Sequence, residues 1–210
     1  MNEYQIIEIF QNNPSYPFLL EDLLGTHFPA QVTYIGNIEI LKQSLLGLFA
    51  SVKCPASLIL KAHDLAQKLV EDCTPVISGF HSPVEKEMLS VLQRGSGSIV
   101  ICPARGLEEM RIPARYHHLF EKGRLLLLSA FPSSIKRPKE NFTQERNRIV
   151  GTLAERIMII YANPGGKIEA LCRDFLKWNK PVFALPGNQN AHLFNQGIQE
   201  FRWAFEISDV

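Results

Sequence analysis

The sequence predicts an α/β fold, a doubly wound and mostly parallel sheet with helices on both faces. Six short apolar runs end in small or turn-forming residues, which is typical of strands buried on both faces. Five stretches with helical periodicity lie between these runs, and such alternation favours parallel pairing of the strands. The chain of 210 residues is long enough for one sizeable domain, and its 46% hydrophobic and 20% charged residues are typical of a packed globular protein.

The six predicted strands follow one another from residue 44 onward. Each apolar run has the length of an ordinary buried strand, about four to eight residues. The runs are LLGLFAS (45–51), PVISG (75–79), SIVIC (98–102), RLLLLSAF (124–131), RIMIIYA (156–162) and PVFALPG (181–187).

The predicted helices lie between these strands and carry recognisable end signals. Ser82 and Glu85, with a proline after the serine, form a capping-box pattern at the start of the second helix. The last helix should end at Asn179 or Lys180, because the next residue is a proline. The expected helices cover 55–72, 82–94, 115–122, 143–155 and 167–179.

The two ends of the chain are less regular. Residues 1–43 show no trustworthy strand alternation, so we expect an N-terminal appendage of short helices and loop, followed by the main domain at 44–210. The first of these short helices is expected in the opening residues. Near the other end, alternate residues of FRWAFEI (201–207) would face one way, as in an edge strand or a dimer contact.

Charge and hydropathy restrict where in the cell the protein can act and which class of partner it can bind. No apolar run approaches the roughly 20 residues that cross a bilayer, and the acidic start lacks the features of a signal peptide. We therefore expect a cytoplasmic protein without a membrane contact. Because the net charge is only +1, a polyanion would have to be bound by a local basic patch.

The cysteines indicate neither a metal site nor a disulfide framework. They are widely scattered, without a CxxC pair and without histidines at finger spacing, so we interpret them as small buried hydrophobic residues. They are Cys54, Cys73, Cys102 and Cys172.

The residues that follow each predicted strand are the candidate ligand-binding residues. In an open parallel sheet, ligands bind at the carboxyl ends of the strands, where helix N-termini present free N–H groups to anions. These loops are small, polar and rich in glycine, which suits a phosphate cradle. They lie at 50–53, 78–81, 103–106, 129–132, 163–166 and 186–188. We expect His81, at one such strand end, to meet a phosphate or a base.

A basic run, KRPKENFTQERNR (136–148), concentrates charge at another strand end. It holds five positive and two negative residues, a local charge of +3, and one large apolar ring, Phe142. We expect residues 141–145 to form a loop and cap, which would place Arg146, Asn147 and Arg148 in the first turn of a helix.

These motifs, taken in order, resemble the DNA processing protein A family (DprA, also called Smf). The matching pieces run from about residue 15 to the end of the chain. They are SYPFLLEDL (15–23), YIGN (34–37), PVISGF (75–80), SIVIC with RGL (98–107), LLSAFP (127–132), ENFTQERNRIVGTL (140–153), VFALPGN (182–188) and QNAHLFNQGI (189–198).

The resemblance implies a Rossmann-like fold and a function. Members of the family bind single-stranded DNA, dimerise, and help load the RecA recombinase in DNA uptake, processing and recombination. It therefore implies a DNA-binding protein that is no enzyme and needs no cofactor, with single-stranded DNA, RecA and a second copy of the chain as partners. Phe142 would be the ring on which a base rests, since an aromatic stacks on a base with about 1–3 kcal/mol.

The predicted phosphate-binding residues come from the resemblance and from the strand-end loops together. The family motifs place Ser51, Ser78, Gly79, Arg146, Asn147 and Arg148 on the phosphates. The loops add Lys53, His81, Gly165 and Gly166.

The chain departs from the family pattern at several of these positions. The family's GSR reads Ala50-Ser51-Val52 here, so Val52 replaces one arginine of the pocket. Lys53 restores the positive charge but not the two parallel hydrogen bonds that a guanidinium can donate. Glu85 stands for an aspartate, and Tyr161 for a glutamate. No winged-helix tail is expected, so the sequence predicts a divergent or minimal member.

Two alternatives share the superfamily and the same residues. NPGGKIEAL (163–171) is similar to the loop of LOG-type phosphoribohydrolases, which cleave nucleoside 5′-monophosphates. In that interpretation Glu169 is the catalytic carboxylate and Arg146 or Arg148 its arginine, although Glu169 follows Pro164 by five residues where the motif has seven. The other alternative is a domain that senses a nucleotide without cleaving it.

Overall fold

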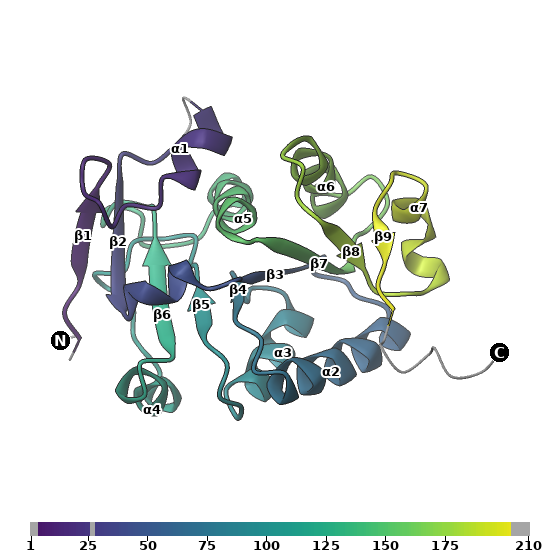
Figure 1. The fold of residues 1–210 in the computed structure, drawn as a ribbon, viewed down its shortest axis with the longest axis horizontal. Helices are drawn as coiled ribbons and strands as arrows, with labels where there is room; N and C mark the ends of the chain where they lie inside the picture. Colours follow the sequence, from purple (N-terminus) through teal and green to yellow (C-terminus); the bar gives the residue numbers. More distant parts are fainter. Residues whose placement is uncertain (1–3, 26–27, 203–210) are drawn as a thin grey trace.

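The computed structural model describes residues 4–25 and 28–202, and within them nine strands form one sheet (Figure 1). The strand order is β1-β2-β6-β5-β4-β3-β7-β8-β9. The strands are β1 (Ile7–Phe10), β2 (Gln31–Gly36), β3 (Leu46–Ala50), β4 (Val76–Ser78), β5 (Ile99–Ile101), β6 (Leu125–Ser129), β7 (Arg156–Tyr161), β8 (Val182–Ala184) and β9 (Gln199–Glu200).

All pairs from β6 to β9 are parallel, which confirms the predicted fold class. Each of the six predicted strands is present, and β3, β4, β5 and β6 are buried along their whole length. Parallel strands between two layers of helices have no solvent-exposed face, so their sequences are uniformly apolar.

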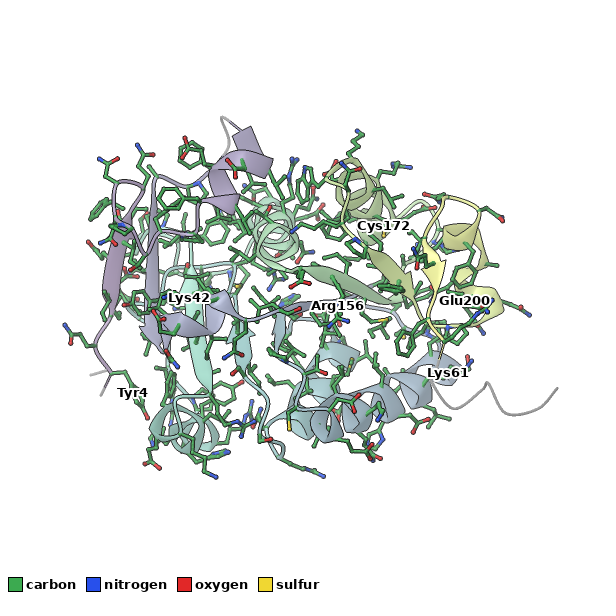
Figure 2. The ribbon with its side chains drawn as sticks, viewed as in Figure 1. Tyr4, Lys42, Lys61, Arg156, Cys172 and Glu200 are labelled. Atoms are coloured by element: carbon green, nitrogen blue, oxygen red, sulfur yellow. The ribbon has the colours of Figure 1, made fainter. Side chains whose placement is uncertain are left out.

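Helices cover both faces of the sheet (Figure 1). Helices α2, α3 and α4 pack on one face, and α1, α5, α6 and α7 on the other, each with its own apolar core. Cys172 lies fully buried on the inner side of α6 (Figure 2). The helices are α1 (Leu19–Leu24), α2 (Ala56–Glu71), α3 (Pro83–Leu92), α4 (His117–Glu121), α5 (Glu140–Leu153), α6 (Lys167–Lys177) and α7 (Ala191–Phe194).

The sheet reverses its order of connection between β3 and β7. From β3 the chain passes through α2 to β4 on one side, whereas from β6 it returns through α5 to β7 on the other side of β3. A crevice forms at the carboxyl edge of such a switch point, because the two flanking connections leave in opposite directions.

The structure corrects the expected start of the chain. Residues 7–10 form strand β1 and not a helix, and β2 pairs antiparallel with both β1 and β6. Strands β1 and β2 thus extend the sheet of the following part, and a boundary after residue 43 stays a prediction. The stretch 201–207 lies almost entirely outside the described residues.

The start of helix α5 also differs from expectation. The helix begins at Glu140, so residues 141–145 are helical and Arg146 lies in the second turn. Glu140 places a negative charge in the first turn, where it is favourable beside the free N–H groups. The Thr143 hydroxyl donates to the carbonyl of Lys139 at 3.1 Å.

The cysteine prediction holds for two of four positions. Cys102 and Cys172 are buried, whereas Cys54 is half-buried and Cys73 exposed. Cys73 follows the end of α2 in a turn with φ of 51°, which places its side chain on the surface. Within residues 4–25 and 28–202, no helix has the length and apolarity needed to span a bilayer.

Lys180 fixes the carboxyl end of α5. Its Nζ donates to the carbonyl of Thr152, in the last turn of the helix, at 2.9 Å and to that of Ala154, directly after the helix, at 2.6 Å. Terminal carbonyls have no partner within their own helix, so a cation there supplies both a hydrogen bond and favourable charge.

We expect Lys180→Met to lower the free energy of unfolding by about 1.5–3 kcal/mol, because it removes hydrogen bonds from a charged donor while keeping the apolar stem. Urea denaturation at neutral pH measures this loss. Lys177→Met, at an exposed position near the end of α6, is the matched control and should change stability by less than about 0.5 kcal/mol. Equal losses for the two variants would contradict the capping role of Lys180.

Candidate functional site

A groove with a volume of about 750 Å³ lies at the predicted edge of the sheet. It is formed by the carboxyl ends of β3, β4 and β7 and by the amino ends of α3, α5 and α6, which meet at the switch point. Its lining residues are Ala50, Ser51, Val52, Lys53, His81, Ser82, Glu85, Pro138, Lys139, Glu140, Thr143, Gln144, Arg146, Asn147, Asn163, Gly165, Gly166, Lys167 and Ile168.

Glu85 forms the floor of this groove. Its carboxylate accepts hydrogen bonds from the backbone N–H groups of Ala50, His81 and Ser82, at 2.9, 2.8 and 3.0 Å. The predicted capping box is confirmed, but the contact with Ala50 also ties helix α3 to strand β3. Burial raises the pKa of the Glu85 carboxyl, and the neighbouring Arg146 charge and the three N–H donors oppose that rise.

Arg146 lies beside Glu85, within the protein and not at its surface. Only 4% of the residue is exposed, and its Nη1 donates to the carbonyl of Cys102 at 2.9 Å. Its Nε donates to Oδ1 of Asn147 at 2.8 Å. The sequence predicted an arginine on the first turn that reaches out to a phosphate, whereas the helix starts earlier and turns this side chain inward.

Gly79 makes room for the Arg146 guanidinium. A Cβ added to Gly79 would lie 1.3 Å from Nη1 and 1.8 Å from Cζ of Arg146. The residue after β4 must therefore be glycine for the arginine to lie in this position.

The rim of the groove carries the accessible positive charge. Lys53 and Lys139 are exposed, and neither has an ion-pair partner among the described residues. Lys167, at the start of α6, pairs with Glu140 at the start of α5. His81 also lines the groove, and its pKa is lowered by burial and then by the charges of Arg146 and Lys86.

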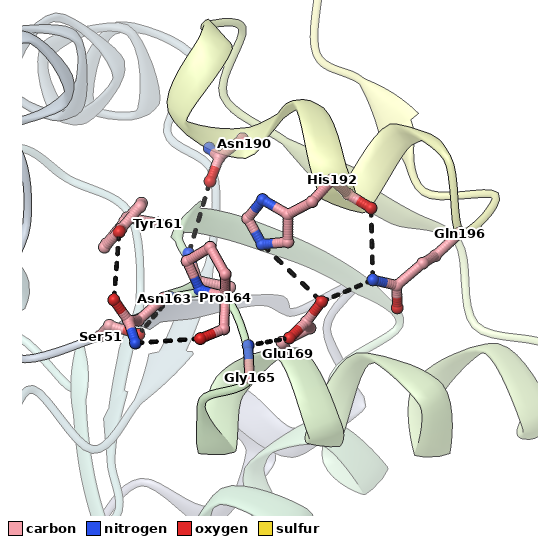
Figure 3. Close-up of polar contacts among 10 residues, drawn as sticks. Ser51, Tyr161, Asn163, Pro164, Gly165, Glu169, Asn190, His192 and Gln196 are labelled. Atoms are coloured by element: carbon pink, nitrogen blue, oxygen red, sulfur yellow. Dashed lines mark hydrogen bonds and ion pairs between the residues drawn. The ribbon is translucent and has the colours of Figure 1, made fainter.

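The loop after β7 forms the other wall (Figure 3). The N–H of Asn163 donates to the hydroxyl of Ser51 at 2.9 Å, which joins the ends of β7 and β3. Gly165 has φ of 70°, a conformation that favours glycine, and the N–H of Gly166 donates to the carbonyl of Asn163 at 2.8 Å. This tight turn places Gly166 at the amino end of α6.

Seven of the eleven predicted DNA-binding residues therefore line one groove, and four lie elsewhere. The four outside are Ser78, Gly79, Phe142 and Arg148. The buried Ser78 hydroxyl donates to the carbonyl of Leu48 at 2.8 Å and accepts from the N–H of Phe80, so it links β4 to β3.

Phe142 and Arg148 project from other sides of α5. The half-buried Phe142 ring lies edge-on to Phe131, with 5.6 Å between the ring centres. Arg148 pairs with Asp174 at 3.7 Å and lies over the ring of Trp178 at 5.7 Å. Their roles on DNA stay predictions.

Glu169, the carboxylate of the hydrolase alternative, does not line the groove. Its oxygens accept from the N–H of Gly165 and from Nε2 of Gln196, and one lies 3.9 Å from Nε2 of His192 (Figure 3). Burial acts to raise the pKa of Glu169, but these hydrogen bonds and the nearby His192 outweigh it and lower the pKa. This carboxylate holds the loop and the start of α6 in place.

Two groove residues, and one residue outside the groove, were not among the predicted phosphate-binding residues. Lys139 belongs to the basic run, and Asn163 directly follows a strand, so both carried a positional signal. Asn190 does not line the groove, and its signal was its place in the matching piece QNAHLFNQGI (189–198). It is fully buried and donates to the carbonyls of Ile160 and Leu185 at 3.1 and 3.0 Å, which fixes the ends of β7 and β8.

Comparisons with known proteins place this architecture in a family. A family model described as DNA recombination-mediator protein A matches residues 8–201. No curated protein sequence matches the chain.

Three solved structures show a similar fold. DNA processing protein A (DprA) from Streptococcus pneumoniae has a TM-score of 0.78 at 19% identity, over 94% of this chain and 71% of that chain. DNA processing protein A from Helicobacter pylori, whose description names a unique single-stranded DNA binding mode, has a TM-score of 0.73 at 16% identity, over 94% and 91%. The molybdenum cofactor carrier protein from Chlamydomonas reinhardtii has a TM-score of 0.53 at 14% identity, over 76% and 91%.

The contact between Gly79 and Arg146 gives a test of the groove floor. We expect Gly79→Ala to lower the free energy of unfolding by about 2–4 kcal/mol, because the new methyl group displaces a buried guanidinium from its hydrogen bonds. The loss should shrink by more than about 1 kcal/mol in an Arg146→Ala background, where the methyl group meets no guanidinium.

Urea denaturation of the two single variants and the double variant measures this coupling. Gly25→Ala is the control, because its φ of 56° strains an alanine while nothing lies within 4 Å of the added Cβ. Additive effects of Gly79→Ala and Arg146→Ala would show that the two residues do not share one site.

Proposed function

The chain belongs to the DNA recombination-mediator protein A family, and we propose that it binds single-stranded DNA along the groove at the carboxyl ends of β3, β4 and β7. A role in DNA processing and recombination follows from the family. The main supporting observation is that Lys53 and Lys139, which have no ion-pair partner within residues 4–25 and 28–202, line the same groove as the amino ends of three helices. Both features favour a chain of phosphates.

The charge distribution supports a local and not a global interaction. With a net charge of +1, the protein as a whole does not attract DNA strongly, so affinity must come from this patch. The buried charge of Arg146 lies beside the Glu85 carboxylate, so the positive charge available to DNA is that of the rim lysines. We place the sugar–phosphate backbone on the lysine rim.

The base-stacking role of Phe142 remains part of the proposal. The ring lies on α5 next to the turns that line the groove, with Thr143 on the groove side. A base that leaves the groove along α5 would meet the exposed face of the Phe142 ring.

Family membership supports three further proposals. The protein acts in the cytoplasm, it functions as a homodimer, and it delivers single-stranded DNA to the RecA recombinase in DNA uptake and recombination. None of these requires a catalytic residue, and the position of Glu169 outside the groove gives no support to phosphoribohydrolase chemistry.

We expect the double variant Lys53→Ala/Lys139→Ala to bind a fluorescent oligo-dT at least about tenfold more weakly at low salt. The slope of log affinity against log salt should become shallower by about 1.4, since each lost phosphate contact on a single strand removes about 0.7. Fluorescence anisotropy at several salt concentrations measures both quantities.

The control for this experiment is Lys122→Ala/Lys177→Ala. Both lysines are exposed and lie away from the groove, Lys122 directly after α4 and Lys177 at the end of α6. This variant has the same net charge as Lys53→Ala/Lys139→Ala. Equal losses for the two double variants would indicate binding by overall charge and would contradict the groove assignment.

Binding should depend on pH through His81. Its pKa lies below the ordinary 6.5 in the unbound protein because burial and two cations disfavour the imidazolium, and an adjacent phosphate would raise it. DNA binding then takes up a proton. The affinity for oligo-dT should therefore rise as the pH falls from about 7 to about 5, by up to about tenfold per pH unit.

His81→Asn should flatten this part of the pH profile, with anisotropy titrations of oligo-dT at each pH as the measurement. Affinity of the variant at pH 7.5, where the wild-type imidazole is neutral, should stay within about twofold of wild type. An unchanged profile in His81→Asn would show that His81 does not face the DNA.

A further inference from the structure

The groove contains an arrangement of N–H groups suited to bind an anion, called the anion seat below, and a side chain of the protein itself occupies it. Three backbone N–H groups, from the end of β3 and from the turn that begins α3, converge on one point. Converging N–H groups at a helix start are the arrangement that binds phosphate in many folds with a parallel sheet. Here the Glu85 carboxylate occupies that point, with only 6% of the residue exposed.

A capping box alone does not account for this arrangement. Of the three hydrogen bonds that the Glu85 carboxylate accepts, the box requires only the one from the N–H of Ser82. The N–H of Ala50 belongs to a different strand, and the Arg146 guanidinium adds positive charge beside the same carboxylate. The surroundings of Glu85 therefore match those of a bound anion.

Two further carboxylates engage groove-lining residues, one through a single backbone N–H group and one through an ion pair. Glu169 accepts from the N–H of Gly165 before α6, and Glu140 pairs with Lys167 at the start of that helix. The inner donors and one cation are thus engaged internally, while Lys53 and Lys139 at the rim remain without ion-pair partners among the described residues.

We propose that Glu85 is a specificity-determining residue, which excludes terminal phosphates from the groove and leaves it selective for phosphodiesters. A phosphomonoester carries a charge of about −1.5 to −2 at neutral pH and would need the inner donors, which the Glu85 carboxylate already occupies. A phosphodiester carries one charge and is held by the rim lysines without reaching the floor. This inference rests on the proposed function, and it identifies why a free nucleotide is a poor ligand.

The first test uses the wild-type protein and a matched pair of competitors. Thymidine 5′-monophosphate and its methyl diester have the same base and sugar and differ in the charge and esterification of one phosphate. We expect the diester to displace fluorescent oligo-dT at a concentration at least about tenfold lower than the monoester. Equal or better displacement by the monoester overturns the proposal.

The second test empties the seat. In Glu85→Ala, inorganic phosphate should raise the melting temperature with saturation, and chloride at equal ionic strength should not. Wild type should show no saturable rise with phosphate. Absence of a phosphate effect in folded Glu85→Ala overturns the proposal.

Glu85→Gln covers the case in which the alanine variant does not fold, because glutamine keeps the side-chain volume and one carbonyl acceptor. Loss of the negative charge should improve displacement by the monoester at least about tenfold and leave the diester within about twofold. An unchanged ratio of the two competitors contradicts a role for the Glu85 charge.

The outcomes separate this inference from the proposed function. If wild-type protein fails to bind oligo-dT, the proposed function fails. The phosphate-dependent melting temperature of Glu85→Ala still reports on the seat, because that measurement uses no DNA.

Discussion

The buried carboxylate of Glu85 is the interaction on which the groove depends. It connects the end of β3, the turn after β4 and the first turn of α3, and its charge is balanced by Arg146 from α5. Either charge alone would be costly to bury, and the attraction between the two charges offsets part of that cost. Arg146 also holds the carbonyl after β5, so that elements from both helical layers meet at one point.

Most of the fold could be predicted from local sequence, and the exceptions have a physical cause. Runs such as LLLL in β6 have few alternatives to a buried strand once turn residues bound them. Strand β1 could not be recognised, because only Ile9 of its four residues is buried and its conformation depends on pairing with β2. Helix α5 was expected to start too late because the basic run at its beginning resembles a loop.

The position of the site could be predicted better than the roles of its residues. The rule that ligands bind at the carboxyl ends of parallel strands depends on topology alone, and it correctly predicts that Ser51, His81 and Gly166 lie in one groove. The direction of a side chain depends on tertiary contacts: Ser78 turns inward to Leu48, and Arg146 turns into the space above Gly79. Glu169 lies two residues after the groove-lining Lys167, and about 100° of rotation per helical residue directs it to Gln196.

The pairing of β3 with β7 has a consequence for biogenesis. Residues 46–50 lie beside residues 156–161, so this central contact spans more than half of the sequence. During synthesis the first half of the sheet can assemble while β7 is still absent, but the groove needs both strands and the start of α6. Contacts between distant residues form slowly, because a long loop must close first. The ligand-binding surface is therefore completed only after β7 and the start of α6 have been made.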